Sequence, residues 1–130
     1  MTEEQALKLF ARCYNRGDFS PIARYIHKKA SYESWDHFYK YTGRGSVAGA
    51  LAEKANMIKE KNPPNRAYMG FVMVRHDIIG LRCEPCVLLT RNDPRQVIGV
   101  MRIKCTPFRM KHFRVCDEKG MTITRGDYVD

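Results

Sequence analysis

The chain has 130 residues, of which 44% are hydrophobic, and a formal net charge of +9 at pH 7. This length fits a single domain, residues 1–130, whose core can form without disulfides or a structural metal. No stretch approaches the roughly 20 apolar residues that span a bilayer. The acidic residues after Met1 also differ from a secretion signal, so we expect a cytoplasmic protein that does not contact membranes.

The first predicted element is an amphipathic helix over residues 3–15. Thr2 and Gln5 have the spacing of a capping box, and apolar residues then recur at helical spacing. Gly17 suits the left-handed conformation that often ends a helix. A short second helix follows, with Ser20 as its N-cap and an end near His27.

Two short strands and a third helix come next. Residues 30–35 alternate well enough for a strand, and the aromatic residues of 38–42 favour a second one. Gly43 breaks that strand, Ser46 is the expected N-cap of the third helix, and this helix must end before Pro63.

The remainder of the chain changes to a period of two. Both alternating sets of residues 67–76 are apolar, which predicts a strand covered on both faces. Further strands are expected at residues 87–91, 97–105, 111–116 and 121–124. The whole order predicts an α+β fold, in which three helices from the N-terminal half cover a curled antiparallel sheet and form a cone-shaped pocket.

This order of elements resembles the nuclear transport factor two-like superfamily, which includes SnoaL-like cyclases and ketosteroid isomerase. The similarity covers nearly the whole chain and rests on Asn15-Arg16-Gly17-Asp18, the strand at 30–34, Gly43-Arg44-Gly45-Ser46-Val47 and His112-Phe113-Arg114. The resemblance implies a ligand pocket, and pairing through the sheet is frequent in such folds. With the two-sided apolar strand, this makes a homodimer the expected assembly.

The residues that ketosteroid isomerase uses do not recur here. Its helix tyrosine, strand aspartate and late protonated aspartate correspond to Phe10, Ser34 and either Lys111 or His112, depending on where the late turn is counted from. A phenylalanine cannot donate a hydrogen bond, and a serine is no base at neutral pH. The resemblance therefore implies a pocket without the isomerase machinery.

The same resemblance places the candidate ligand-binding residues. Those expected near the pocket mouth, on its apolar wall or at the matched isomerase positions are Phe10, Tyr14, Tyr32, Ser34, Trp35, Met73, Met101, Lys111 and His112. The expected ligand is a small, partly apolar molecule.

Asp36 and His37 are the candidate catalytic residues. A histidine beside a carboxylate can act as a general base with a pKa near neutrality. A corner rich in tryptophan, aspartate and histidine is also what an exposed turn looks like. Proton transfer by His37 or Asp36, in an isomerase-like or cyclase-like reaction, is thus one interpretation, and an ordinary turn is the other.

The five cysteines cannot all pair, and we expect reduced, mostly buried thiols. Cys83 and Cys86 have the spacing of half a zinc site or of a redox dithiol. The second half of a zinc site is missing, and no helix is expected after Cys86, as a thioredoxin-type pair would require. The sequence therefore predicts neither a metal nor an organic cofactor.

A second function class comes from the charge. Six basic residues with no acid among them lie between positions 93 and 117, namely Arg95, Arg102, Lys104, Arg109, Lys111 and Arg114. On neighbouring strands they would form a basic stripe able to attract an acidic protein or nucleic acid, although a solvated sheet face is the simpler interpretation. The sequence thus leaves open a small-molecule binder, with or without turnover, and a non-catalytic interaction module.

Overall fold

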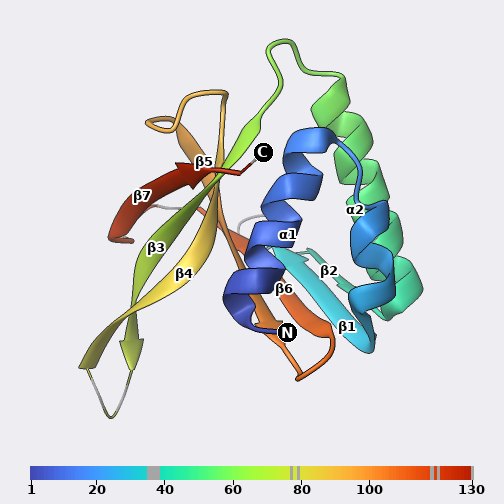
Figure 1. Ribbon diagram of the computed structural model, residues 1–130, viewed down its shortest axis with the longest axis horizontal. Helices are drawn as coiled ribbons and strands as arrows, with labels where there is room; N and C mark the ends of the chain where they lie inside the picture. Colours follow the sequence, from blue (N-terminus) through green and yellow to red (C-terminus); the bar gives the residue numbers. More distant parts are fainter. Residues whose placement is uncertain (35–38, 77, 79, 118, 120, 130) are drawn as a thin grey trace.

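The structure, a computed structural model, describes residues 1–34, 39–76, 78, 80–117, 119 and 121–129. Its elements in chain order are α1 (Glu3–Arg16), the 3₁₀ helix η1 (Ser20–Tyr25), β1 (Ile26–Ser34), β2 (Tyr39–Thr42), α2 (Arg44–Lys59), β3 (Arg66–His76), β4 (Gly80–Thr90), β5 (Val97–Cys105), β6 (Met110–Cys116) and β7 (Ile123–Tyr128). Figure 1 shows both α-helices on one side of a curved sheet, with the β3–β4 hairpin extending away from them. The predicted α+β class is confirmed.

Within the described residues, seven strands form one sheet in the order β2-β1-β6-β5-β4-β3-β7. The strands β3 to β6 form the predicted antiparallel meander. The meander then ends beside β1, and β1 and β6 run parallel. The curled sheet is therefore mixed, because the first strand pairs with a strand that comes about 80 residues later and not with its sequence neighbour alone.

The first helix forms as its sequence predicts. The Thr2 hydroxyl accepts a hydrogen bond from the Gln5 backbone N–H at 3.1 Å, and the Gln5 side chain accepts one from the Thr2 N–H at 2.9 Å. Gly17 ends the helix with φ of +67°. The apolar face of α1 is buried against the sheet, which places Tyr14, near its C-terminal end, inside the molecule.

The two predicted serine caps are wrong. The 3₁₀ helix η1 begins at Ser20 itself, and its N-cap is Phe19, which makes no side-chain capping bond. The Ser20 backbone N–H donates to the Asp18 carboxylate at 2.9 Å. The α2 helix starts at Arg44, before Ser46, and its N-cap is Gly43 with φ of +92°. The Gly43 N–H donates to the Ala30 carbonyl at 2.7 Å, so contact with β1 sets this helix start, which sequence spacing cannot reveal.

Tertiary pairing lengthens three predicted strands. The strand expected at 30–35 starts at Ile26, the one expected at 87–91 starts at Gly80, and the one expected at 121–124 runs from Ile123 to Tyr128. The β3–β4 ladder continues through Pro85, although proline is rare in the interior of a strand. Proline is tolerated there because β5 pairs with β4 only over residues 87–90, so β4 has a single neighbour at Pro85.

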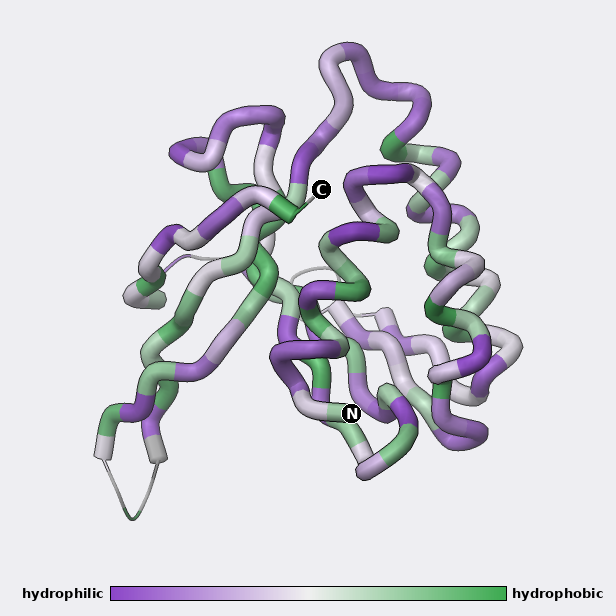
Figure 2. The backbone as a smooth tube through the Cα atoms, in the orientation of Figure 1, coloured by the Kyte–Doolittle hydropathy of each residue, from purple (hydrophilic) through white to green (hydrophobic). Residues whose placement is uncertain are grey.

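The core lies between the helices and the concave face of the sheet. Phe10 of α1 and Phe113 of β6 are fully buried, with ring centroids 6.5 Å apart. A smaller cluster of Val72, Cys86 and Leu88 with their neighbours lies on the opposite face. Figure 2 shows hydrophobic stretches within the helices and strands and a hydrophilic connection between α2 and β3. None of the described helices is long and apolar enough to cross a membrane.

Candidate functional site

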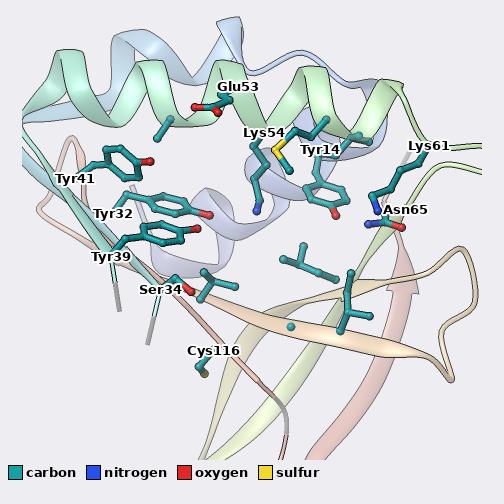
Figure 3. Close-up of a pocket in the computed structure, with 17 residues that line it drawn as sticks. Tyr14, Tyr32, Ser34, Tyr39, Tyr41, Glu53, Lys54, Lys61, Asn65 and Cys116 are labelled. Carbon is teal, nitrogen blue, oxygen red and sulfur yellow. The ribbon is translucent and has the colours of Figure 1, made fainter. Parts of the chain in front are cut away.

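A cavity of about 450 Å³ lies between α2 and the concave face of the sheet (Figure 3). Its walls come from α1, α2, the β1–β2 pair and the ends of β4, β5 and β6. This volume is in the range of sites for small organic ligands. The two helices cover different parts of the sheet, because α1 packs on β3, β4 and β5 while α2 packs on β1 and β2. The cavity lies under α2.

One wall of the cavity consists of three tyrosines. In the β1–β2 ladder Tyr32 pairs with Tyr41 and Ser34 with Tyr39, so their side chains share one face. The rings of Tyr32 and Tyr39 are stacked, with centroids 6.4 Å apart and an interplanar angle of 4°, and Tyr41 meets Tyr32 edge-on at 6.4 Å. Tyr39 and Tyr41 are each 38% exposed, so this wall also opens the cavity to solvent.

The Tyr32 hydroxyl is a buried polar group at the site, and its nearest polar neighbours include the Tyr39 hydroxyl. Tyr32 is 2% exposed, and its oxygen has no partner at hydrogen-bond geometry in the described structure. Burial raises the pKa of Tyr32, and the nearby Tyr39 hydroxyl raises it further, so this phenol keeps its proton. A buried hydroxyl without a partner is costly, which marks it as a group able to donate to a bound molecule.

Tyr14 brings a second hydroxyl from α1 to the other side of the cavity (Figure 3). Burial raises its pKa, and a hydrogen bond that the Asn65 side chain donates to the phenol oxygen partly opposes this shift. Tyr14 is therefore a protonated donor that already has one partner of its own.

Lys54 of α2 points into the cavity between these two sets of hydroxyls (Figure 3). Burial lowers the pKa of its ammonium group, because the charged form loses hydration. Its neighbour Glu53 is exposed, and Figure 3 draws the Glu53 carboxylate away from the amine. Among the remaining lining side chains are Met57, Ile58 and Leu89, which supply apolar surface.

Three of the predicted ligand-binding residues line this cavity, namely Tyr14, Tyr32 and Ser34. Phe10 and Met101 lie instead in the fully buried core. Phe10 packs against other aromatic rings, with the Phe19 ring 5.1 Å away. These two predicted positions are therefore filled by core packing and do not line the cavity.

The other three predicted positions in the sheet are away from the cavity. Met73 lies on the β3–β4 hairpin beyond the helices. Lys111 and His112 are on β6, but His112 is on the face opposite to the buried Phe113, where its Nδ1 lies 2.7 Å from the Ser31 hydroxyl oxygen. Successive strand residues face opposite sides of the sheet. An alignment with the family that is shifted by one residue therefore assigns an outward-facing residue to the cavity face.

Trp35, Asp36 and His37 fall outside the described residues. The catalytic hypothesis for Asp36 and His37, and the placement of Trp35 at the pocket mouth, stay predictions.

Sequence reasoning missed Tyr39, Tyr41 and Lys54. The signal for Lys54 is its position three residues after Leu51 and four before Ile58, both buried, which puts a lysine on the apolar stripe of α2. Tyr39 and Tyr41 are two residues apart, so the sequence indicates that they share one face of a strand. Which face this is depends on the register with β1, which the sequence does not reveal.

The two cysteines spaced like half a zinc site face opposite sides of β4. Across the ladder Cys83 pairs with Met73 and Cys86 with Gly70, and residues three apart on a strand point in opposite directions. Cys83 is exposed and Cys86 is buried. Burial, with smaller effects of Cys83 and Cys116, raises the pKa of the Cys86 thiol to about 12. The two sulfurs therefore cannot hold one ion together.

The basic stripe is largely balanced by carboxylates. In the described part of the chain, four of its six side chains form salt bridges: Arg95 with Asp93, Arg102 with Glu84, Lys104 with Glu3 and Arg114 with Glu33. The stripe thus has a weaker positive potential than its sequence alone predicts.

Comparison with solved structures identifies the fold. The chain is similar to a nuclear transport factor two-like protein of unknown function from Mesorhizobium loti, with TM-score 0.59 and 16% identity over 88% of this chain and 92% of that one. It is also similar to a de novo designed protein with a curved β-sheet, with TM-score 0.53 and 14% identity over 90% and 88% of the two chains.

A Rhodopseudomonas palustris protein whose name assigns it provisionally to the isomerases has TM-score 0.50 and 14% identity, over 88% of this chain and 85% of that one. No protein family matches the chain by sequence, and no curated protein does so either. The chain has the nuclear transport factor two-like fold. At these identities the likeness defines the fold alone, so the function must be argued from the site.

Proposed function

We propose that the protein binds a small molecule with a partly apolar, ring-sized body and one polar head group in the cavity under α2. The observation that supports this most directly is the buried Tyr32 hydroxyl without a described partner, which faces a space of about 450 Å³. A bound oxygen or nitrogen acceptor would satisfy that hydroxyl, while the tyrosine rings and apolar side chains would cover the ligand body.

Native mass spectrometry of freshly purified protein, followed by denaturing spray of the same sample, is the first test. We expect an added mass in the native spectrum that is lost on denaturation. The Ala50→Phe variant should remove it, because Ala50 lines the cavity and a phenyl ring would fill the space. Ala52→Phe is the control, since Ala52 is exposed on the same helix and does not line this cavity. Equal retention by the Ala50→Phe protein would overturn the proposal.

Turnover is the stronger form of the same proposal. A cofactor-free isomerase-like or cyclase-like reaction would need a group that moves a proton, and Asp36 and His37 are the candidates. Asp36→Asn and His37→Ala should then abolish turnover of the retained molecule while leaving its binding and the melting temperature unchanged. Unchanged rates in both variants would remove these two residues from the mechanism.

The interaction module is a separate proposal with its own test. A complex formed by charge weakens steeply as salt rises, whereas burial of an apolar ligand changes little. Binding of heparin and of short RNA should be titrated at low and high salt. The local pairing of the basic stripe favours the cavity over this alternative. Tight RNA binding at low salt that falls steeply as salt rises would contradict that ranking, and the lack of any binding at low salt would count against the interaction module.

A further inference from the structure

Lys54 is placed where α2 would otherwise carry an apolar side chain. It lies on the same face of the helix as the buried Leu51 and Ile58, is itself partly buried, and points into the cavity (Figure 3). Among the described residues, no salt bridge or hydrogen bond reaches its side-chain nitrogen. A lysine held in this way is not stabilised by a partner, so its position calls for a role other than a structural ion pair.

The surroundings of the amine favour nucleophilic chemistry. The cavity walls beside it carry tyrosine hydroxyls, which are neutral, and apolar side chains such as Ile58 and Leu89. Burial lowers the pKa of Lys54, so a larger fraction of this lysine is the neutral amine than on the surface. A desolvated lysine in an apolar pocket is the form that attacks carbonyl carbons.

We propose that Lys54 is a nucleophile that forms a Schiff base with an aldehyde or ketone bound in the cavity. This inference rests on the proposed function, because the carbonyl compound must first occupy the same space. It adds the chemical class of the ligand and the residue that reacts with it.

The step balances without an oxidant or a reductant. The amine lone pair forms a C–N bond to the carbonyl carbon, and the electron pair of the C=O bond moves to the oxygen. The proton that the nitrogen loses passes through water to that oxygen, while the Tyr32 hydroxyl keeps its own proton and can donate a hydrogen bond to the oxygen. The resulting carbinolamine loses its hydroxyl group, which leaves as water with the remaining proton of the nitrogen, and C=N forms. The products are one imine and one water molecule.

Reductive trapping tests the proposal with a defined probe. The protein is incubated with 4-hydroxybenzaldehyde and sodium cyanoborohydride at neutral pH, so that any imine becomes a stable secondary amine. Intact mass and peptide mapping should show one hydroxybenzyl group per chain, on Lys54, formed faster than on any other lysine, since the lowered pKa leaves more of this lysine as free amine.

Matched variants separate the nucleophile from its charge. Lys54→Arg keeps a positive charge and Lys54→Met matches the apolar stripe, and both should lose the rapid adduct while keeping a folded circular dichroism spectrum. Lys29→Arg is the control, because Lys29 is an exposed lysine that does not line the cavity. An adduct of equal rate and yield in the two Lys54 variants, or an adduct spread evenly over surface lysines, would overturn the proposal.

A second probe distinguishes this inference from the proposed function. 4-Hydroxybenzyl alcohol has the same ring but no carbonyl group, and its binding is measured by the rise in melting temperature and by calorimetry. Binding of the alcohol and of the aldehyde without a Lys54 adduct would refute the Schiff base and leave the cavity proposal intact. Failure of both probes to bind, together with no adduct, would count against both proposals.

Discussion

Asn15 joins three segments of the chain through one side chain. Its amide donates to the Ala67 carbonyl at 2.9 Å and to the Val129 carbonyl at 2.6 Å, and its oxygen accepts the Ala67 N–H at 2.7 Å. These bonds hold the end of α1 against β3 and against the end of the chain. They therefore also fix the place of Tyr14, the neighbouring residue in the cavity wall.

We expect Asn15→Ala to lower the free energy of unfolding by about 2 kcal/mol, because it leaves a buried N–H and two carbonyls without partners. Urea denaturation measures this loss. Asn56→Ala, at an exposed position of α2, should change it by much less. Equal stabilities of the two variants would show that water replaces the Asn15 contacts.

The burial of Lys54 also predicts how the free energy of unfolding depends on pH. Its pKa is lowered in the folded state, so the unfolded chain binds more protons between that folded value and the ordinary value of 10.5. Stability is therefore reduced while Lys54 is charged, and it recovers as the pH rises through the folded pKa toward 10.5.

Lys54→Met should thus raise the free energy of unfolding by about 1 kcal/mol at neutral pH, since it removes a poorly hydrated charge. The advantage over the natural chain should shrink in alkaline buffer. Denaturation at neutral and alkaline pH measures both effects, with Lys61→Met as the exposed control. A destabilised Lys54→Met protein at neutral pH would indicate a partner for the amine.

At the scale of elements, β7 depends on a close backbone contact. A Cβ at Gly126 would lie 2.6 Å from the Met69 carbonyl oxygen, where β7 pairs with β3 around an irregularity in register. Only glycine lets the two backbones approach this closely.

Gly126→Ala should therefore destabilise the protein by about 2 kcal/mol through overpacking. Hydrogen exchange of the β7 amides should accelerate as well. The matched control is Gly45→Ala in α2, where a Cβ would meet nothing within 4 Å. That control should raise stability by about 0.5 to 1 kcal/mol, because alanine favours the helix. An unaffected Gly126→Ala protein would mean that β7 can shift at little cost.

At the scale of the whole molecule, the expected homodimer stays a prediction. The β3–β4 hairpin, which leaves the body in Figure 1, carries Phe71 at 46% and Leu81 at 65% exposure. If these side chains meet a second copy, light scattering after gel filtration should give twice the 15.1 kDa chain mass. The double change of Phe71 and Leu81 to lysine should give the single mass. Phe108→Lys, at an exposed loop residue elsewhere, is the control.

The sequence by itself determined the elements that depend on neighbours along the chain. The capping box at Thr2, the left-handed Gly17 and the bounds of the 97–105 strand all follow from local hydrogen bonding and from apolar periodicity. The order of elements then defined the α+β class and its resemblance to nuclear transport factor two-like proteins, because few topologies satisfy such an order. The resemblance in turn implied that Tyr14, Tyr32 and Ser34 lie at a pocket, and all three line the cavity.

The tertiary structure alone decided what depends on pairing between distant residues. The parallel contact of β1 with β6 sets which β6 residues face inward, and it places His112 beside Ser31 on the outer face. The crossing of α2 over the sheet turns Lys54 from a surface residue into a cavity residue. Strand register and helix crossing are fixed by long-range packing. A register shift of one residue moves a side chain from the core or the cavity to the solvent.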